Sequence, residues 1–210
     1  MAITIKPKKT NTSTEEKIKE AAKTVFHKKG FAATRTRDIA EHAGINLALL
    51  NYYFRSKQKL FEIIMFEAIS GFVQNMVVVV NNNNSSLDGK IEAIANNYID
   101  FLSKEPGVPL FIVSEIRNNP DALYKRFTLA QVILDSVFLK QYREAVAQGR
   151  VAEPNPVHFL INLMGLIVFP FIAQPLLMKI TNTKHKQFLA LMQERKRQIP
   201  VWVKAMMYRD

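Results

Sequence analysis

The sequence predicts an all-α protein. Apolar residues recur at spacings of three and four along most of the 210 residues, which is the period of one face of a helix. The periodic runs end at glycine, proline, asparagine or serine, residues that commonly terminate helices. One run typical of a strand, Val77 to Val80, continues a long helical pattern, so we expect a frayed helix end there and no sheet.

The N-terminal part begins with a polar leader, residues 1–13, which contains several lysines and lacks apolar periodicity. We expect this leader to be a flexible basic arm. A first helix follows from Thr14, and Gly30 is its predicted stop. The core stripe of this helix consists of Ile18, Ala21, Ala22, Val25 and Phe26.

Residues 34 to 60 predict two short helices joined by a glycine turn. Thr36 is the expected N-cap of a helix that runs to about Ala43, and Gly44 stands where a positive φ is required. Asn46 is the expected cap of a second helix, Leu47 to Phe54, which follows the turn residue Ile45. Its Leu50 and Phe54 face inward, whereas Leu47, Ala48, Asn51 and Tyr52 face outward. This is a helix-turn-helix pattern, and its second helix is the candidate reader of the DNA major groove.

The remainder of the chain predicts further helical segments separated by short breaks. Asn81 to Asn84 form an exposed loop, Pro106 to Pro109 and Asn118 to Pro120 interrupt the pattern, and Gly149 closes a long helix. Pro200 is expected to kink the last segment or to start a new helix. The predicted segments are residues 57–80, 87–104, 109–117, 121–148, 157–178 and 184–208.

The net charge of +11 is concentrated near the N-terminus. Residues 1–60 hold 13 lysines and arginines against 5 acidic residues, a surplus of 8, which leaves 3 for the rest of the chain. Such a surplus favours binding to phosphates and predicts an affinity that falls steeply with salt, although a solvated charged face would have the same composition. The absence of cysteine excludes disulfides and thiolate sites, and the lack of a signal peptide favours the cytoplasm, close to the nucleoid.

The segment Val157 to Met178 carries no charge and is long enough to cross a bilayer. Two prolines and three polar residues interrupt it, namely Pro170, Pro175, His158, Asn162 and Gln174. A helix that is apolar all round is equally typical of a buried core or a subunit interface. We therefore expect no membrane association, and keep a membrane anchor as an alternative.

The first helix and the helix-turn-helix form one ungapped pattern over Thr14 to Phe66, about a quarter of the chain. The second helix of the motif ends in Tyr-Tyr-Phe-Arg-Ser-Lys at 52–57. This pattern resembles the tetracycline-repressor (TetR) family of bacterial transcription regulators. The resemblance implies a three-helix DNA-binding domain at 14–56 and a helical effector-binding and dimerisation domain at 57–210. It also implies a homodimer in which segments 157–178 and 184–208 pack with their two-fold mates as a four-helix bundle, which would let two recognition helices read a palindromic operator.

The resemblance also assigns DNA contacts. Thr36, Arg37, Tyr52, Tyr53 and Lys57 are expected to meet phosphates, which positions the protein without reading sequence. Base contacts are expected from Leu47, Ala48, Leu49 and Asn51, with Asn46 as a further candidate. The leucines depart from the commoner polar residues, so readout would rely on thymine methyl groups, and on Asn51 for adenine. Leu49 as plain core and Tyr53 packed beneath the motif are the alternatives.

In the family, the helical body holds a small-molecule pocket whose ligand releases DNA. An unknown small apolar or amphipathic effector is therefore expected here. Glu115, Arg117 and His158 are polar groups near apolar runs that could orient it, although capping, pairing or exposure would also explain them. The candidate lining residues are large apolar side chains, for which core packing is the alternative: Phe72, Met76, Tyr98, Phe101, Phe111, Phe127, Met164 and Phe169.

Catalysis, cofactors and metals are not expected. The histidines at 27, 42, 158 and 185 lack ligand spacing, and the chain contains no glycine-rich phosphate loop and no nucleophile elbow. The leading hypothesis is thus a dimeric repressor released by an effector. The alternative is a DNA-binding protein of the same fold that needs no effector and acts through a protein partner or in nucleoid organisation.

Overall fold

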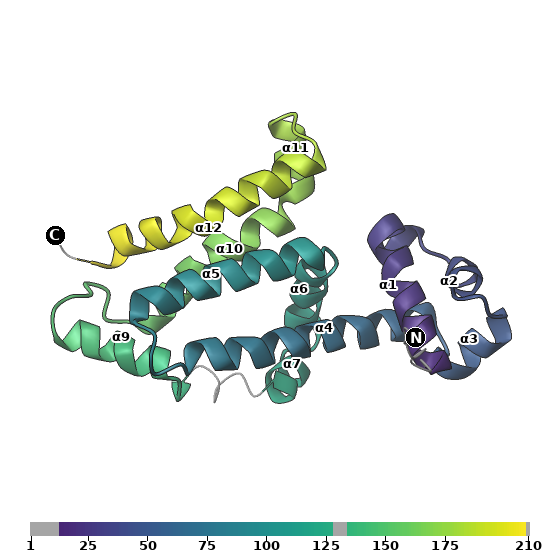
Figure 1. Cartoon of the computed structure of the whole chain (residues 1–210), viewed down its shortest axis with the longest axis horizontal. Coiled ribbons are helices and arrows are strands. Elements are labelled where there is room, and N and C mark those ends of the chain that lie inside the picture. The colour runs from purple at the N-terminus through teal and green to yellow at the C-terminus, as the bar shows by residue number, and fades with distance from the viewer. Residues whose placement is uncertain (1–12, 128–133, 209–210) are drawn as a thin grey trace, which may run out of the picture. The chain divides into compact units, whose positions relative to one another are not determined.

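The computed structural model describes residues 13–127 and 134–208, and within them the regular secondary structure is helical apart from an isolated bridge between Val151 and Tyr208 (Figure 1). The described residues form two compact units, one ending at Phe66 and one starting at Glu67. Residues 1–12 of the expected leader lie outside the described residues. Helix α4 (Lys57–Val80) runs through both units, so the domain boundary at residue 57 stays a prediction.

The first unit contains α1 (Thr14–Ala33), α2 (Thr36–Ala43), α3 (Leu47–Phe54) and the start of α4. Helix α1 begins after Ser13, whose hydroxyl accepts the Glu16 backbone N–H at 3.2 Å. The predicted stripe of α1 is buried. Gly30 has a φ of 74°, so it breaks the helical geometry as expected, but one further turn follows it and the helix ends at Ala33.

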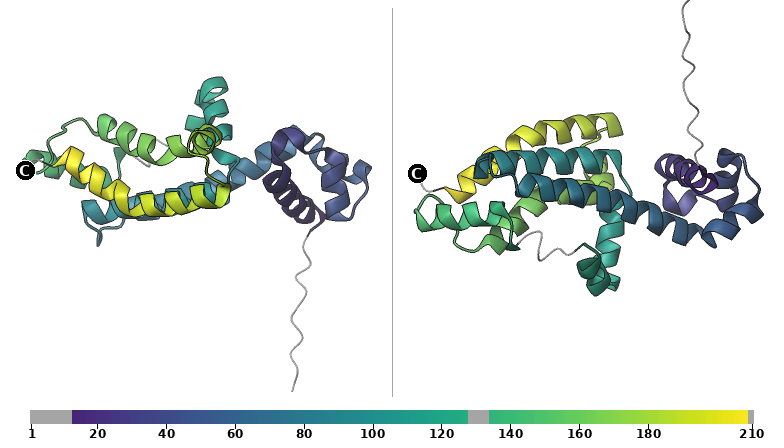
Figure 2. Two further views of the ribbon diagram at one scale, coloured as in Figure 1. Left: turned by 90° about the horizontal axis from the view of Figure 1, so that it is seen from above. Right: turned by 60° about the horizontal axis from the view of Figure 1, so that its bottom comes forward.

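The second unit is built from the rest of α4 and the later helices. Helices α5, α10 and α12 pack on one another around buried residues such as Ile99, Leu163 and Ile199 (Figures 1 and 2). The helices after α4 are α5 (Leu87–Lys104), α6 (Val108–Asn118), α7 (Pro120–Phe127), α9 (Val137–Ala147), α10 (Pro156–Ile172), α11 (Gln174–Ile180) and α12 (His185–Met207).

The prediction of one long helix over 121–148 is wrong. Helix α7 ends at Phe127, and α9 starts anew at Val137. Ser136 adopts an extended backbone, with φ −68° and ψ 151°, and its hydroxyl accepts the Leu139 N–H at 3.2 Å. The apolar spacing had suggested one continuous helix, because apolar spacing carries no information about an N-cap. The pair Asp135-Ser136 was the feature of the sequence that could have indicated the start of a new helix.

The uncharged stretch 157–178 is likewise divided. Helix α10 ends at Ile172, and α11 starts at Gln174 with Pro175 in its first turn. In a continuous helix Pro175 would have no N–H for the Phe171 carbonyl and its ring would clash with that carbonyl, which is consistent with a new helix starting just before it. Pro170 lies inside α10 and Pro200 inside α12, and both helices continue past them.

Two apolar stretches among the described residues have the length and composition of a membrane span: α4 alone, and α10 with α11 if the two are counted together. The latter pair bends by 70°, so it is no straight span. Helix α4 contributes Leu60, Ile64, Ile69 and Phe72 to the cores of the two units, and 22% of its most apolar window is buried.

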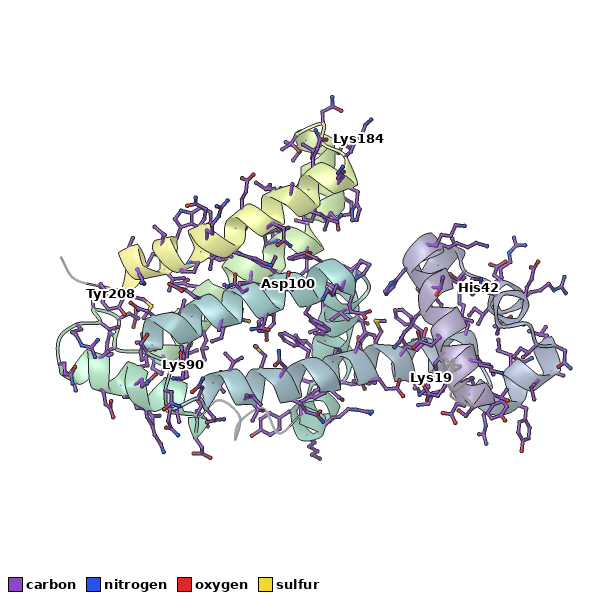
Figure 3. The ribbon with its side chains drawn as sticks, in the orientation of Figure 1. Lys19, His42, Lys90, Asp100, Lys184 and Tyr208 are labelled. Atoms are coloured by element: carbon purple, nitrogen blue, oxygen red, sulfur yellow. The ribbon has the colours of Figure 1, made fainter. Side chains whose placement is uncertain are left out.

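Polar contacts tie the helices of the second unit together (Figure 3). The fully buried Lys90 ammonium donates to the Ser85 carbonyl at 2.6 Å and to Gln141 Oε1 at 2.9 Å. Lys196 on α12 pairs with Asp100 on α5. The Tyr208 hydroxyl donates to Asp88, which fixes the end of α12 to the start of α5.

Candidate nucleic-acid interface and apolar cavity

The turn between α2 and α3 has the geometry that the sequence predicts. Gly44 lies in the left-handed region, with φ 66° and ψ 35°, and its N–H donates to the carbonyls of α2. The Ile45 N–H donates to the Ala40 carbonyl at 3.0 Å. Asn46 Oδ1 accepts the Leu49 N–H at 2.8 Å and so caps α3. The two helices are thus joined by a short turn in which the N–H groups of Gly44 and Ile45 pair with carbonyls of α2.

Helix α3 has a buried side and an exposed side. Leu50 and Phe54 are buried, as expected. Ala48, Asn51 and Tyr52 are exposed, and Tyr52 keeps 81% of its surface accessible. An exposed amide, a methyl group and a phenol on one helix face are suited to contacts in a nucleic-acid groove.

The two leucines and Tyr53 take intermediate positions. Leu47 and Leu49 are half-buried, so Leu49 is partly accessible and is not part of the buried core. Tyr53 is 41% exposed, and its ring centroid lies 5.5 Å from that of Tyr52 in an edge-to-face contact. The described side chains of α3 include no charged group, which makes this surface apolar and amide-bearing.

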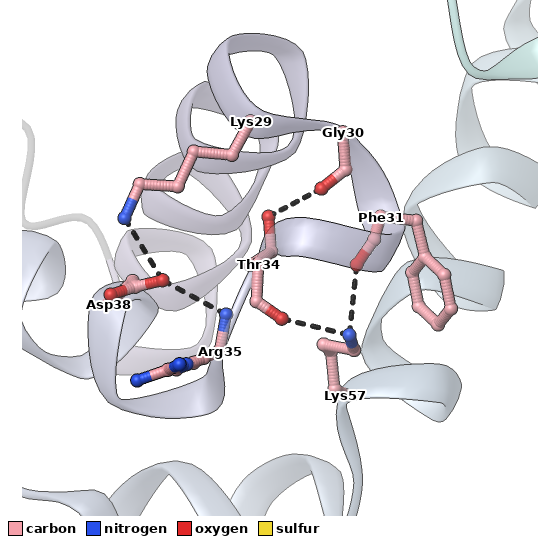
Figure 4. A network of polar contacts seen from close by, with 7 residues as sticks. All are labelled: Lys29, Gly30, Phe31, Thr34, Arg35, Asp38 and Lys57. Atoms are coloured by element: carbon pink, nitrogen blue, oxygen red, sulfur yellow. Dashed lines mark hydrogen bonds and ion pairs between the residues drawn. The ribbon is translucent and has the colours of Figure 1, made fainter.

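The N-terminus of α2 differs from the prediction in its cap. Arg35, and not Thr36, is the N-cap residue, and Thr36 is the first helical residue and half-buried. Asp38 Oδ2 accepts the Arg35 backbone N–H at 2.9 Å, while Lys29 Nζ lies 3.0 Å from the same carboxylate (Figure 4). The N–H of Arg35, followed by the Lys29 ammonium, holds the pKa of the Asp38 carboxyl below its ordinary value. No side-chain hydroxyl caps α2; instead the carboxylate of Asp38, in its first turn, accepts the N–H of the N-cap residue Arg35.

The same network gives Lys57 a role that the sequence did not predict. Its ammonium donates to the carbonyls of Phe31 and Thr34, each at 2.8 Å, and lies 4.3 Å from the centroid of the Phe31 ring. The Thr34 hydroxyl donates to the Gly30 carbonyl at 2.7 Å. Lys57 thus joins the start of α4 to the turn between α1 and α2.

Three exposed cations near the helix ends were not among the predicted DNA contacts. Arg35 precedes α2, Arg55 follows α3 with a φ of 58°, and Lys59 lies in the first turn of α4. Arg37, which was predicted, is also exposed. All three lie beside the N-terminus of α2 or of α4, and this position was the signal that could have included them, because phosphates are commonly bound at helix N-termini.

The second unit contains an apolar cavity of about 190 Å³ between α4, α5, α9 and α10. Its described lining includes no charged side chain. The Tyr98 ring packs edge-on against the Phe72 ring, with centroids 4.4 Å apart. Burial raises the pKa of Tyr98 to about 12. The described lining residues are Phe72, Val73, Met76, Val80, Ile94, Tyr98, Ser136, Phe138, Leu160, Leu163 and Met164.

Half of the predicted lining residues are among them, namely Phe72, Met76, Tyr98 and Met164. The other half lie elsewhere. Phe101 stacks against Phe72, with ring centroids 4.3 Å apart, whereas Phe111 and Phe127 are buried core residues. Phe169 is 61% exposed. Helical periodicity had grouped these phenylalanines because it identifies a buried face without showing where packing leaves space.

The remaining polar candidates do not line the cavity. His158 is exposed and lies 3.3 Å from Glu153, and Glu115 and Arg117 belong to the last turns of α6. His185 contacts Gln174 at 2.8 Å. Across residues 13–127 and 134–208, no group of three or more His, Asp or Glu side chains is arranged to hold a metal ion.

Comparison with known proteins gives matches over both units. The family model for bacterial regulatory proteins of the tetR family matches residues 18–64, from α1 into α4. The "Probable HTH-type transcriptional regulator YttP" of Bacillus subtilis (strain 168) is 24% identical over 169 residues, which cover 76% of this chain and 78% of that protein.

Two solved structures share the fold. A Mesorhizobium loti MAFF303099 protein assigned to the TetR family of transcriptional regulators has a TM-score of 0.62 at 15% identity, covering 93% of this chain and 97% of that one. HlyIIR, a hemolysin II transcriptional regulator, has a TM-score of 0.54 at 18% identity, covering 85% of this chain and 96% of that one. At these identities the similarity shows the fold alone.

Proposed function

This chain belongs to the tetR family of bacterial regulatory proteins and is a DNA-binding transcriptional regulator, and from that premise we propose that it is a repressor acting as a homodimer on a palindromic operator. A small molecule bound in the second unit would release it from DNA. The observation that carries the proposal is the capped α3, whose exposed face presents Ala48, Asn51 and Tyr52.

In this proposal α3 enters the major groove. Asn51 donates to and accepts from one adenine, and Leu47, Ala48 and Leu49 contact thymine methyl groups. Asn46 serves chiefly as the cap of α3 because its Oδ1 is already engaged by the Leu49 N–H. An α3 surface without a basic residue has no bidentate partner for guanine, so we expect an operator core rich in A·T pairs.

Phosphate contacts surround this reading surface. Arg37 and the phenol of Tyr52 are the most accessible of the predicted residues, Tyr53 is less exposed than Tyr52, and Thr36 is half-buried. To these we add Arg35 and Arg55, both exposed beside helix ends. Phosphate contacts of this kind set the orientation of the protein and the salt dependence of its affinity.

The proposed dimer surface is formed by α10 and α12. Exposed apolar side chains follow one side of each helix, including Ile161 at 63% and Leu191 at 51%. Gly165 lies on the same stripe of α10, and a Cβ there would meet nothing within 4 Å, which leaves room for a close-packed partner helix. The other exposed members are Val157, Phe169, Val201, Trp202 and Met206.

The cavity supports release by an effector over the effector-independent alternative. A body filled with side chains would have favoured a protein that acts only through a protein partner. A cavity of about 190 Å³ with an apolar lining instead provides a place for a ligand. Ligand binding would shift the dimer toward a state with low DNA affinity only if the ligand binds that state more tightly.

The test is selection of bound sequences from random duplex DNA by the purified full chain, with its mass in solution measured alongside. We expect an A·T-rich palindrome bound by a dimer. Enrichment of a single, non-repeated site by a monomer would overturn the homodimer, and failure to enrich any motif would favour the effector-independent alternative in nucleoid organisation.

A further inference from the structure

We propose that the cavity between α4, α5, α9 and α10 binds an uncharged molecule about the size of one substituted benzene ring, with a single hydroxyl or carbonyl group that pairs with the Tyr98 hydroxyl. This inference rests on the proposed effector site and defines the chemical class of its ligand. Three observations carry it: the volume of the cavity, the absence of charge in its described lining, and the state of Tyr98.

The volume limits the size of the ligand. The cavity measures about 190 Å³. Apolar cavities of about 150 Å³ admit benzene, whereas pockets for drug-sized ligands have roughly 300 to 1,000 Å³. A monocyclic molecule with one or two small substituents fits this space without displacement of the surrounding helices. Met76 and Met164 are flexible parts of the wall, and they allow small differences in ligand shape.

The lining selects against charge. The described residues around the cavity are apolar apart from Tyr98 and Ser136, so a carboxylate or an ammonium group would enter without a counter-ion. Burial of an unpaired charge is far more costly than burial of a neutral polar group. The Ser136 hydroxyl already accepts the Leu139 N–H at 3.2 Å, which commits it to the cap of α9.

Tyr98 is the polar group left for a ligand. Tyr98 lines the cavity, and among the described residues its hydroxyl has no hydrogen-bond partner. The ring is held by an edge-to-face contact with Phe72, which itself stacks on Phe101 at an interplanar angle of 8°. A tyrosine phenol is neutral at physiological pH, and burial raises the pKa of Tyr98 further, to about 12, so its hydroxyl offers one donor and one acceptor.

An aromatic ligand is favoured over an aliphatic one of equal size. Phe72 and Phe138 both line the cavity, from α4 and α9 respectively. Two aromatic rings in an offset or edge-to-face arrangement contribute more stabilisation than the burial of their apolar area alone would give. A single ring bearing a polar group therefore uses the phenylalanines, the apolar wall and Tyr98 together.

The test measures binding of three probes to the full chain by calorimetry without DNA: 4-methylphenol, toluene and 4-methylbenzoate at pH 7. We expect 4-methylphenol to bind the wild type about 5- to 10-fold more tightly than it binds Tyr98→Phe, which corresponds to one neutral hydrogen bond. Toluene should bind both proteins equally, and 4-methylbenzoate should bind neither. Equal affinity of 4-methylphenol for both proteins, or tighter binding of 4-methylbenzoate, would overturn the inference.

Tyr124→Phe is the matched control, because Tyr124 lies on α7 and is 54% exposed outside the cavity. It should bind 4-methylphenol as the wild type does. Ile94→Phe, which adds volume to the wall, should weaken the binding of both 4-methylphenol and toluene. Unchanged binding would place the ligand elsewhere and reject the site.

Operator release is measured separately. Probe binding without release would contradict the effector mechanism but not the ligand class, whereas specific DNA binding with no probe bound would reject this inference alone.

Discussion

At the scale of single residues, the exposed face of α3 gives each side chain a distinct expected role. Asn51 is exposed and is the side chain on α3 whose amide matches adenine. The neighbouring Leu47 and Leu49 are half-buried, so each has both a packing and a contact surface. Substitutions at these positions should therefore differ in how far they affect sequence preference and stability.

Replacement of Asn51 with alanine should relax sequence preference at one base pair in each half-site. We expect a loss on the order of 1 to 3 kcal/mol for the preferred base pair, and little change on random DNA, because only a base contact is removed. Competition binding with operators altered at each position measures this. Equal losses on operator and random DNA would show that Asn51 does not read a base.

Lys57 is expected to act through the fold of the N-terminal unit more than through a phosphate contact. Lys57→Met keeps the alkyl chain but removes the two hydrogen bonds to Phe31 and Thr34, so unfolding should become easier by about 1 to 3 kcal/mol. The slope of log affinity against log salt should stay unchanged, since the number of neutralised phosphates stays the same.

Arg37→Ala is the control for this prediction. Its exposed guanidinium is free to meet phosphate, and the salt slope should fall by about 0.9 for each phosphate that the variant no longer neutralises, with stability unchanged. A Lys57→Met protein of normal stability with a reduced salt slope would instead support the phosphate contact that the sequence suggested.

At the scale of elements, the proline within α10 has a specific partner on α12. Pro170 has no N–H, so the Leu166 carbonyl one turn earlier lacks its helical donor. Arg195 Nη2 donates to that carbonyl at 2.7 Å, and the guanidinium lies 5.0 Å from the centroid of the Trp202 ring. Arg195 thereby pairs with the carbonyl of α10 that lacks its helical donor, and it packs on Trp202 of its own helix, α12.

A double-mutant cycle tests this compensation. Arg195→Met should destabilise the protein by about 1 to 3 kcal/mol because it leaves the carbonyl unpaired. In a Pro170→Ala background, residue 170 supplies the missing N–H, and the cost of Arg195→Met should fall by roughly 1 kcal/mol. Chemical denaturation gives the four stabilities. Identical costs in both backgrounds would mean that Arg195 acts only through Trp202.

At the scale of the whole molecule, DNA affinity depends on the proposed pairing of two chains. Ile161→Glu places a charge in the apolar stripe of α10, so we expect a monomer with a helical second unit, and loss of operator binding. The exposed Ile116 on α6 gives the control, since Ile116→Glu should leave the dimer and its affinity intact. Sedimentation and operator titration measure both. A dimer that survives Ile161→Glu would place the interface on another surface.

The sequence by itself determined the local structure of the N-terminal unit. Gly44, Asn46, Leu50 and Phe54 have distinct local signatures, and each occupies the place predicted for it. Caps, turns and one-sided burial depend on residues close together in the chain, so a single sequence is sufficient to identify them. The bounds of α4 and α5 were predicted for the same reason.

Tertiary structure alone decided what depends on residues far apart in the chain. The ammonium of Lys57 meets carbonyls more than twenty positions earlier, and Arg195 meets a carbonyl 29 positions earlier. The cavity arises where α4, α5, α9 and α10 fail to fill the space between them, which is why Tyr98 lines it and Phe111 does not. Periodicity identifies the buried face of a helix, whereas packing between helices determines which buried side chains leave space for a ligand.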